Sequence, residues 1–287
     1  LIEKSLEGKA RIMAMVKADA YGHGAVAVSK ALERCGVRSL GVATVEEGVE
    51  LRDAGIRVPI LVMGGLMGVG SPASERMVEA QLTPVIHSSG VLPSLEAAAK
   101  AFGRTIGIHL KIDTGMTRLG VRPEFLASLL KNVQSCDHLV VEGVMTHLAD
   151  AGEEEVASEQ MEVFRGCRGT IEEVVGRVPI WHVANSIAVL KGWPIEVKEA
   201  GEVWVRPGLS LYGNVDGMDF GGETLQPVMG LESRAVLLKH VPAGTRVSYG
   251  GTFTTMRPSR LAIVPIGYAD GYPWRASGSA QVLVRGR

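Results

Sequence analysis

Met13-Ala14-Met15-Val16-Lys17-Ala18-Asp19-Ala20-Tyr21-Gly22-His23-Gly24 is the stretch of this chain that decides its fold. A short apolar run ends abruptly at a lysine, and turn-prone residues follow it. An apolar run without helical periodicity, with glycines beyond it, predicts a buried strand. Lys17 at the carboxyl end of that strand either reaches water or tends to lose its proton, because poor solvation disfavours an ammonium group. A neutral amine is the form that Schiff-base chemistry requires.

The composition describes a globular protein with no obvious electrostatic partner. The chain has 287 residues, of which 46% are hydrophobic and 21% charged, and this length suits one large α/β barrel or two medium domains. A formal net charge of −1 gives no reason to expect a nucleic acid or an anionic membrane surface as partner. The longest apolar runs fall far below the ~20 residues that span a bilayer, so no membrane association is expected.

The cysteines and the chain ends give two further expectations. Three widely spaced cysteines form no CxxC pair, and their odd number argues against a disulfide framework; they are Cys35, Cys136 and Cys167. We therefore expect a reducing compartment, the cytoplasm, and no metal site. The chain begins without Met and stops directly after a strand-like segment at 280–284. We expect the natural protein to be longer at both ends.

Strand-like and helix-like segments alternate over the first two thirds of the chain. Helical spacing of apolar residues occurs at 25–35, 45–54, 124–133 and 153–175. The strand candidates are 12–16, 39–43, 59–63, 84–86, 105–112, 139–145, 178–183 and 203–205. Eight strands with crossover helices predict a (β/α)8 TIM-type barrel. The alternative, an open doubly wound sheet, favours a Gly-rich fingerprint in its first turn, and the Gly22-His23-Gly24 spacing does not match one.

The pattern changes after Gly213. Segments 229–240, 246–254 and 261–267 are strand-like, and no amphipathic run of helical length lies between them. The sequence therefore predicts an α/β barrel domain at 1–213, a linker at 214–224, and the start of a truncated β-rich domain at 225–287.

The carboxyl ends of the predicted strands carry the residues with chemistry. Active sites of such barrels lie at this face, which makes it a geometric filter. Basic and hydroxyl-bearing side chains follow strands one, five, six, seven and eight: Lys17, Lys111, Arg118, His147, Ser186 and Arg206. Taken singly, Ser186 could be only a helix cap, Arg118 a surface ion-pair partner, and His147 or His182 a core histidine. Residues placed by chance would be spread over both ends of the barrel. The shared placement of these six residues at one end therefore favours a single site.

The loops after strands seven and eight predict the ligand class. Barrels often bind phosphate in these two loops. Ser186 can open a helix there, and Gly208 lets the backbone approach a ligand closely. A reactive lysine facing a phosphate cradle indicates pyridoxal 5′-phosphate held as an internal aldimine.

Several motifs, in family order, resemble the alanine racemases, which are fold-type III pyridoxal-phosphate enzymes. The segment 16–24 resembles their cofactor-attachment signature. The resemblance continues in Asp113-Thr114-Gly115-Met116-Thr117-Arg118-Leu119-Gly120, in His182-Val183-Ala184-Asn185-Ser186, in Val205-Arg206-Pro207-Gly208, in Val247-Ser248-Tyr249-Gly250, and in Ile266-Gly267-Tyr268-Ala269-Asp270-Gly271. It covers the chain from Ile12 to its end.

The resemblance implies a role for each matching residue. Lys17 would hold the cofactor and act as one base, and Tyr268 of a second subunit would be the other base. Arg206 would face the pyridine nitrogen, backed by His147 and His182. Lys111 matches a position that is often carbamylated, and Arg118 would contact the cofactor's phenolic oxygen and the substrate carboxylate. The phosphate would be held by Tyr21, Ser186, Gly208 and Leu209.

These roles imply a homodimer that interconverts L-alanine and D-alanine and so supplies D-alanine for peptidoglycan. Racemisation removes a proton from one face of the α-carbon and returns one to the other, which two bases on opposite faces achieve directly. An arginine at the pyridine nitrogen keeps its own proton, because its pKa exceeds ~12. Tyr268 needs a cationic neighbourhood to act as a phenolate, since tyrosine ordinarily has a pKa near ~10.

The chain also departs from the family pattern. A Met-Asp segment that completes the partner's substrate pocket, and a later Tyr that contacts phosphate, have no counterpart before Arg287. Three alternatives stay open: a related racemase acting on serine or several amino acids, a non-catalytic pyridoxal-phosphate carrier, and a decarboxylase of the same two-domain plan. Arg118-Leu119-Gly120 matches the alanine-specific pattern, and a tyrosine base at Tyr268 disfavours the carrier and the decarboxylase.

Overall fold

The computed structural model describes residues 1–66, 71–193, 201–213, 219–220 and 223–286. The chain divides into two compact units, Leu1–Met229 and Gly230–Arg287. Of the predicted linker 214–224, residues 214–218 and 221–222 lie outside the described residues. Among the helices that the structure describes, none has both the length and the apolar character needed to cross a membrane.

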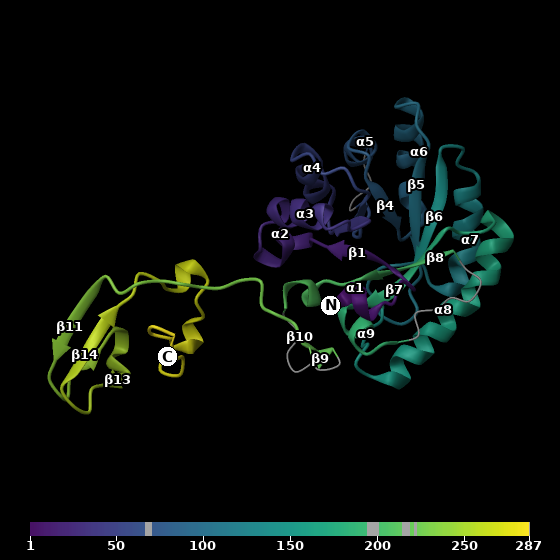
Figure 1. The fold of residues 1–287 in the computed structure, drawn as a ribbon. Coiled ribbons are helices and arrows are strands. Elements are labelled where there is room, and N and C mark those ends of the chain that lie inside the picture. Colours follow the sequence, from purple (N-terminus) through teal and green to yellow (C-terminus); the bar gives the residue numbers. More distant parts are fainter. Residues whose placement is uncertain (67–70, 194–200, 214–218, 221–222, 287) are drawn as a thin grey trace. The chain divides into compact units, whose positions relative to one another are not determined.

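The first unit is a closed barrel of eight parallel strands, and the predicted fold class is confirmed (Figure 1). Each strand pairs with the next along the chain, and the last pairs with the first. The strands are β1 (Arg11–Met15), β2 (Ser39–Val42), β3 (Ile60–Val62), β4 (Thr83–Ile86), β5 (Ile106–Lys111), β6 (Leu139–Met145), β7 (Ile180–Asn185) and β8 (Glu202–Arg206). All eight predicted strands are present, and no end differs from its prediction by more than two residues.

Helices connect the strands. The longest is α8, whose apolar residues at helical spacing face the barrel, as predicted. The helices are α1 (Ile2–Ser5), α2 (Lys17–Gly22), α3 (Ala25–Arg34), α4 (Val45–Asp53), α5 (Ser71–Glu79), α6 (Leu92–Ala101), α7 (Pro123–Gln134), α8 (Glu154–Val175) and α9 (Ser186–Leu190). Single 3-10 turns occur at η1 (Ser89–Val91) and η2 (Leu209–Tyr212). The two-stranded pair β9 (Asp219–Phe220) and β10 (Glu223–Thr224) follows β8 along the chain.

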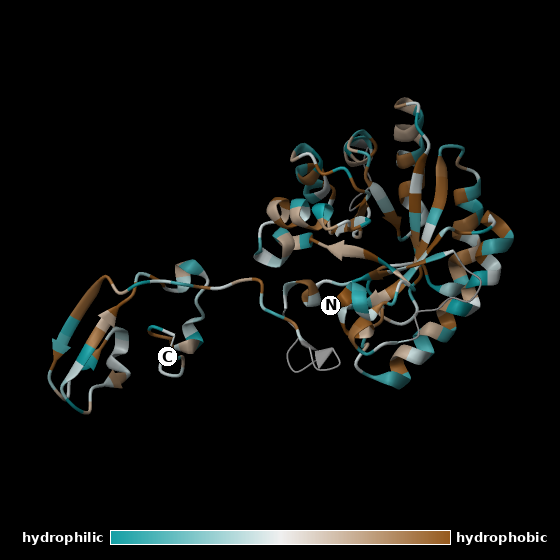
Figure 2. Ribbon diagram, viewed as in Figure 1, coloured by the Kyte–Doolittle hydropathy of each residue, from teal (hydrophilic) through white to brown (hydrophobic). Residues whose placement is uncertain are grey.

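The barrel interior holds both apolar and polar side chains. Successive side chains of a strand point to opposite faces, so residues that alternate with the helix-facing core lie inside the barrel. A separate buried cluster of strand residues occupies the interior: Met13, Leu61, Val85, Met145 and Trp204. His109, Lys111, His182 and Arg206 alternate with helix-facing residues of β5, β7 and β8 and are also buried. Figure 2 shows β5 and β6 as mostly hydrophobic strands with hydrophilic interruptions.

The second unit is built from short antiparallel pairs. β11 (Leu237–Val241) pairs with β14 (Ser259–Ile263), and β12 (Arg246–Val247) pairs with β13 (Phe253–Thr254). The 3-10 turns η3 (Tyr249–Gly251), η4 (Tyr268–Asp270) and η5 (Trp274–Ala276) complete it.

The sequence correctly predicted β-strands in this unit, but the predicted residue ranges were wrong. The expected strand 229–240 corresponds to β11, which begins only at Leu237. The expected strand 261–267 corresponds to β14, which covers Ser259–Ile263. The expected strand 246–254 is a hairpin interrupted by η3, because Gly250 and Gly251 take positive φ and turn the chain. The segment 280–284 forms no strand.

Candidate active site

A cavity of about 360 Å³ opens where the barrel strands end at their carboxyl termini. Four basic side chains line it, Lys17, Lys111, Arg118 and Arg206, and none of the lining residues that the structure describes carries a carboxylate. Tyr21, His147, Ser186, Gly208 and Leu209 also line it, so every barrel residue predicted to bind the cofactor or substrate reaches this cavity. A cavity with this charge attracts a ligand that carries several negative charges.

A left-handed turn begins directly after Lys17. Residues 18–21 of α2 have φ of 52° to 56°, a conformation that costs a residue other than glycine roughly 1–2 kcal/mol. Glu47 accepts a hydrogen bond from the Ala18 amide at 2.8 Å, and Asp19 accepts one from the Ala25 amide at 2.6 Å. These bonds hold the strained turn, which carries Lys17 and Tyr21 to the same cavity.

Lys17 lies in surroundings that favour the neutral amine. Burial lowers the pKa of Lys17, and the guanidinium groups of Arg118 and Arg206 lower it further. Glu47 raises this pKa, but its effect is smaller than those of burial and of Arg118. The amine can therefore act as a nucleophile or a base nearer to neutral pH than an exposed lysine.

Arg206 at the end of β8 is a buried cation held by neutral acceptors. Its Nη2 donates to the carbonyl oxygens of Thr146 and Val183 at 2.7 and 2.8 Å and lies 3.2 Å from His147 Nδ1. Its Nη1 donates to His182 Nδ1 at 3.0 Å. Burial lowers the pKa of Arg206 to about 9, which leaves the guanidinium charged at neutral pH. Burial and the charge of Arg206 lower the pKa of His147 to about 3.

The loops after β7 and β8 form a small polar cradle. Ser186 Oγ accepts hydrogen bonds from the amides of Gly208 at 2.9 Å and Ser210 at 3.2 Å, and it also lies 3.1 Å from Ser210 Oγ. A Cβ on Gly208 would overlap the Tyr21 hydroxyl oxygen and lie 3.1 Å from Tyr21 Cζ. Only glycine fits here while the Tyr21 hydroxyl keeps its place.

Lys111 and Arg118 approach the cavity from the end of β5 and the loop after it. Lys111 is only 4% exposed, and burial together with Arg118 and Arg206 lowers its pKa to about 8. Asp113 closes the loop by accepting hydrogen bonds from the amides of Gly115 and Thr117. Arg118 is exposed at the mouth of the cavity and can meet an anionic ligand there.

The lowered pKa of Lys111 predicts how stability depends on pH. Between pH 8 and its ordinary value of 10.5, Lys111 is largely deprotonated in the folded chain and protonated in the unfolded chain. The unfolded state then binds more protons, so the free energy of unfolding rises with pH in this window. We expect a rise of about 2–3 kcal/mol from pH 8 to pH 10, relative to a Lys111→Met variant, in urea titrations without carbon dioxide. Parallel pH profiles for the two chains would contradict it.

The structure also identifies residues that the sequence reasoning missed. Glu47 belongs to a capping box with Thr44 at the start of α4, and the Thr-x-x-Glu spacing could have found it. Gln160 of α8 donates to Thr114 Oγ1 at 3.0 Å and to the His147 carbonyl, which ties two site loops together. No sequence signal marks Gln160, because its partners come from distant segments. His109 lies two residues before Lys111 on β5, and the two-residue period places both side chains inside the barrel.

Tyr268 belongs to the second unit. It opens η4, and its side chain is 76% exposed. Asp270 accepts a hydrogen bond from the Gly267 amide at 2.9 Å and fixes this turn. The barrel of one chain therefore gathers every predicted site residue except Tyr268.

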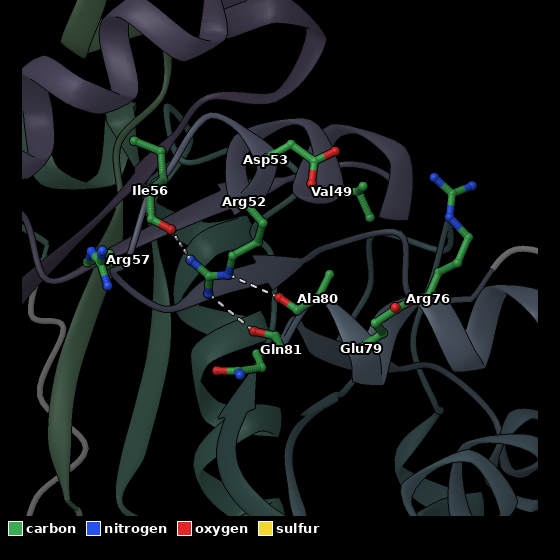
Figure 3. Close-up of a pocket in the computed structure, with 9 residues that line it drawn as sticks. All are labelled: Val49, Arg52, Asp53, Ile56, Arg57, Arg76, Glu79, Ala80 and Gln81. Atoms are coloured by element: carbon green, nitrogen blue, oxygen red, sulfur yellow. Dashed lines mark hydrogen bonds between the residues drawn. The ribbon is translucent and has the colours of Figure 1, made fainter. Parts of the chain in front are cut away.

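A larger cavity of about 550 Å³ lies between the carboxyl ends of α4 and α5 (Figure 3). Arg52 lines this cavity, and its guanidinium donates hydrogen bonds of 2.8 to 3.2 Å to four carbonyl oxygens, those of Ile56, Val58, Ala80 and Gln81. Arg52 thus joins two helix–strand loops where strands begin. Residues at that end of a barrel serve stability rather than catalysis.

The fold and the cavity define a (β/α)8 barrel with a lysine and further basic side chains at the carboxyl ends of its strands. The family model described as the N-terminal domain of alanine racemase matches residues 1–216, and the model described as its C-terminal domain matches residues 228–287. The chain belongs to the alanine racemase family. Enzymes of this family are isomerases that act on an amino acid and use pyridoxal 5′-phosphate.

Individual alanine racemases are similar to this chain over its whole length. An alanine racemase from Halothermothrix orenii is 40% identical over 290 residues, which cover 100% of this chain and 74% of that protein. The structure of an alanine racemase from Clostridium difficile 630 is 34% identical with a TM-score of 0.89, over 100% of this chain and 74% of that one. An alanine racemase structure from Streptomyces lavendulae is 38% identical with a TM-score of 0.88, over 100% of this chain and 75% of that one.

Proposed function

We propose that this chain interconverts L-alanine and D-alanine with pyridoxal 5′-phosphate bound at Lys17. The observation that carries the proposal is the placement of Lys17, with its lowered pKa, in a cavity whose described lining residues include three further basic groups and no carboxylate. The cofactor's phosphate and the carboxylate of an amino acid are both anions, and this cavity has cationic groups for both.

The residues present fit the cofactor at both of its ends. The cradle of Ser186, Gly208 and Tyr21 offers hydroxyl groups and a backbone without a Cβ, which suits a phosphate, and Leu209 borders it. At the other end, the buried Arg206 guanidinium presents a charged donor that keeps its proton. Bound pyridoxal phosphate withdraws electrons from the α-carbon of the amino acid and makes its hydrogen acidic.

The remaining residues orient the substrate. Arg118 at the mouth pairs with the substrate carboxylate and with the cofactor's phenolic oxygen. Lys111, if carbamylated, becomes an anion beside Arg118 and fixes that guanidinium. Its lowered pKa supports this modification, because only a neutral amine reacts with carbon dioxide.

Two bases complete the proposed chemistry. Lys17 takes or returns the α-hydrogen on one face, and Tyr268 of a second copy of the chain serves the opposite face. A homodimer with two equivalent mixed sites follows from this arrangement. We place the enzyme in the cytoplasm, where it supplies D-alanine for peptidoglycan.

The direct experiment measures D-alanine formed from L-alanine by the purified chain in the presence of pyridoxal 5′-phosphate. L-serine and L-lysine, assayed separately, test the related racemases. We expect turnover of L-alanine to exceed that of both other amino acids. Faster turnover of L-serine would assign the chain to a different substrate, and binding of pyridoxal phosphate without any turnover would favour a carrier.

A Gly208→Ala variant tests the phosphate cradle. The added methyl group overlaps the Tyr21 hydroxyl, so that hydroxyl must leave its place. We expect the dissociation constant for pyridoxal 5′-phosphate to rise roughly ten- to hundredfold, measured by fluorescence titration. Gly166→Ala is the matched control, because a Cβ on Gly166 of α8 meets nothing within 4 Å. Equal affinities for the two variants would remove Gly208 from the cradle.

A further inference from the structure

Three buried side chains form one hydrogen-bonded row inside the barrel. Arg206 Nη1 lies 3.0 Å from His182 Nδ1, and His182 Nε2 lies 2.8 Å from His109 Nδ1. Arg206, His182 and His109 are 3%, 0% and 3% exposed, so water does not compete for these bonds. The row joins side chains of β8, β7 and β5.

The direction of every hydrogen bond in this row follows from Arg206. A guanidinium can only donate, so His182 Nδ1 must accept and carries no hydrogen. The hydrogen of neutral His182 is then on Nε2, which donates to His109 Nδ1. His109 Nδ1 therefore accepts as well, and the hydrogen of His109 is on Nε2. Arg206 thus determines the tautomer of both rings.

Both rings are held neutral. Burial and the charge of Arg206 lower the pKa of His109 to about 3 and that of His182 well below its ordinary value. A protonated His182 would present an N–H group to the Arg206 N–H group. A protonated His109 would likewise present an N–H group to His182 Nε2–H.

The barrel makes room for the last ring of the row. Gly143 on β6 lies against His109, and a Cβ there would overlap the imidazole, with 2.7 Å to His109 Cγ. The register of β5 and β6 pairs Gly143 with His109 directly.

We propose that His109 is a positioning residue: it accepts the His182 Nε2 hydrogen and so holds the ring that presents Nδ1 to the Arg206 guanidinium. Without an acceptor at position 109, the buried Nε2–H group of His182 has no partner, so the ring turns and Nδ1 moves away from Arg206. The guanidinium then loses one of the acceptors that hold it in the place where it meets a bound ligand. That last consequence rests on the proposed function, whereas the tautomers do not.

The first test is nitrogen NMR of the purified chain with labelled histidine, without cofactor. Long-range proton–nitrogen correlations distinguish the two neutral tautomers from the charged ring. We expect His182 and His109 as Nε2–H tautomers, unchanged from pH 5.5 to 8.5. A His182 that carries its hydrogen on Nδ1, or that titrates near its ordinary pKa of 6.5, overturns the proposal.

The second test uses two variants of matched shape. His109→Asn keeps an oxygen acceptor close to the position of Nδ1, and His109→Leu has a similar outline without the acceptor. We expect His109→Leu to shift the His182 Nδ1 resonance, because the hydrogen bond from Arg206 weakens, and to raise the dissociation constant for pyridoxal 5′-phosphate about tenfold, with His109→Asn within about threefold of the unaltered chain. Equal effects of Asn and Leu on this resonance would show a purely packing role and contradict the proposal. A shifted Nδ1 resonance without loss of cofactor affinity would contradict the link between the row and the ligand.

Discussion

Replacing Lys17 by alanine will lower the rate of alanine racemisation at least about 10³-fold, because one change removes both the cofactor attachment and one base. The surroundings of Lys17 in the cavity are the reason to expect so large a loss of rate. Lys17 is the lysine that follows β1 directly, and burial with two guanidinium groups keeps its amine reactive. The rate of D-alanine formation from L-alanine measures the loss.

The control and a second readout separate chemistry from folding. Lys30→Ala removes an exposed lysine of α3 and is expected to leave the rate unchanged. Borohydride treatment of the holoenzyme, followed by peptide mass analysis, is expected to place reduced cofactor on Lys17 and on no other lysine. Label on Lys111 instead, or full activity of Lys17→Ala, would show that the wrong amine has been assigned.

Replacing Tyr268 by phenylalanine will lower the racemisation rate about 10²–10⁴-fold, while cofactor affinity stays close to that of the unaltered chain. The phenol oxygen is lost, but the ring and the exposed η4 turn remain. Tyr249→Phe is the matched control, since Tyr249 is another exposed tyrosine of the second unit. A Tyr268→Phe rate within a few-fold of the unaltered chain would exclude Tyr268 as a base.

Mixing two inactive variants tests whether the bases come from different copies. A dimer of Lys17→Ala with Tyr268→Phe has one site with both changes and one site with neither, if each site is shared between subunits. After unfolding and refolding together, about one quarter of the full activity is expected to return, since half of the dimers are mixed and each has one intact site. No recovery would indicate that both bases come from the same chain.

The sequence by itself determined the barrel and most of its site. Alternating apolar and amphipathic segments predicted eight strands, and the strand-end rule then selected Lys17, Lys111, Arg118, His147, Ser186 and Arg206, because parallel strands of a barrel all end at one face. Those residues do line one cavity. The strand predictions were less accurate in the second unit, where short exposed strands depend on turns more than on periodicity.

Only the tertiary structure decided the protonation states and the orientations of those side chains. Whether Lys17 is neutral depends on burial and on the charges of Arg118 and Arg206. These arginines lie about 100 and 190 residues away in the sequence, so no local sequence pattern shows that they are close to Lys17 in space. The left-handed turn at 18–21 depends on Glu47 from another helix. The tautomers of His109 and His182 depend on Arg206, because a hydrogen bond needs a partner in space rather than in sequence.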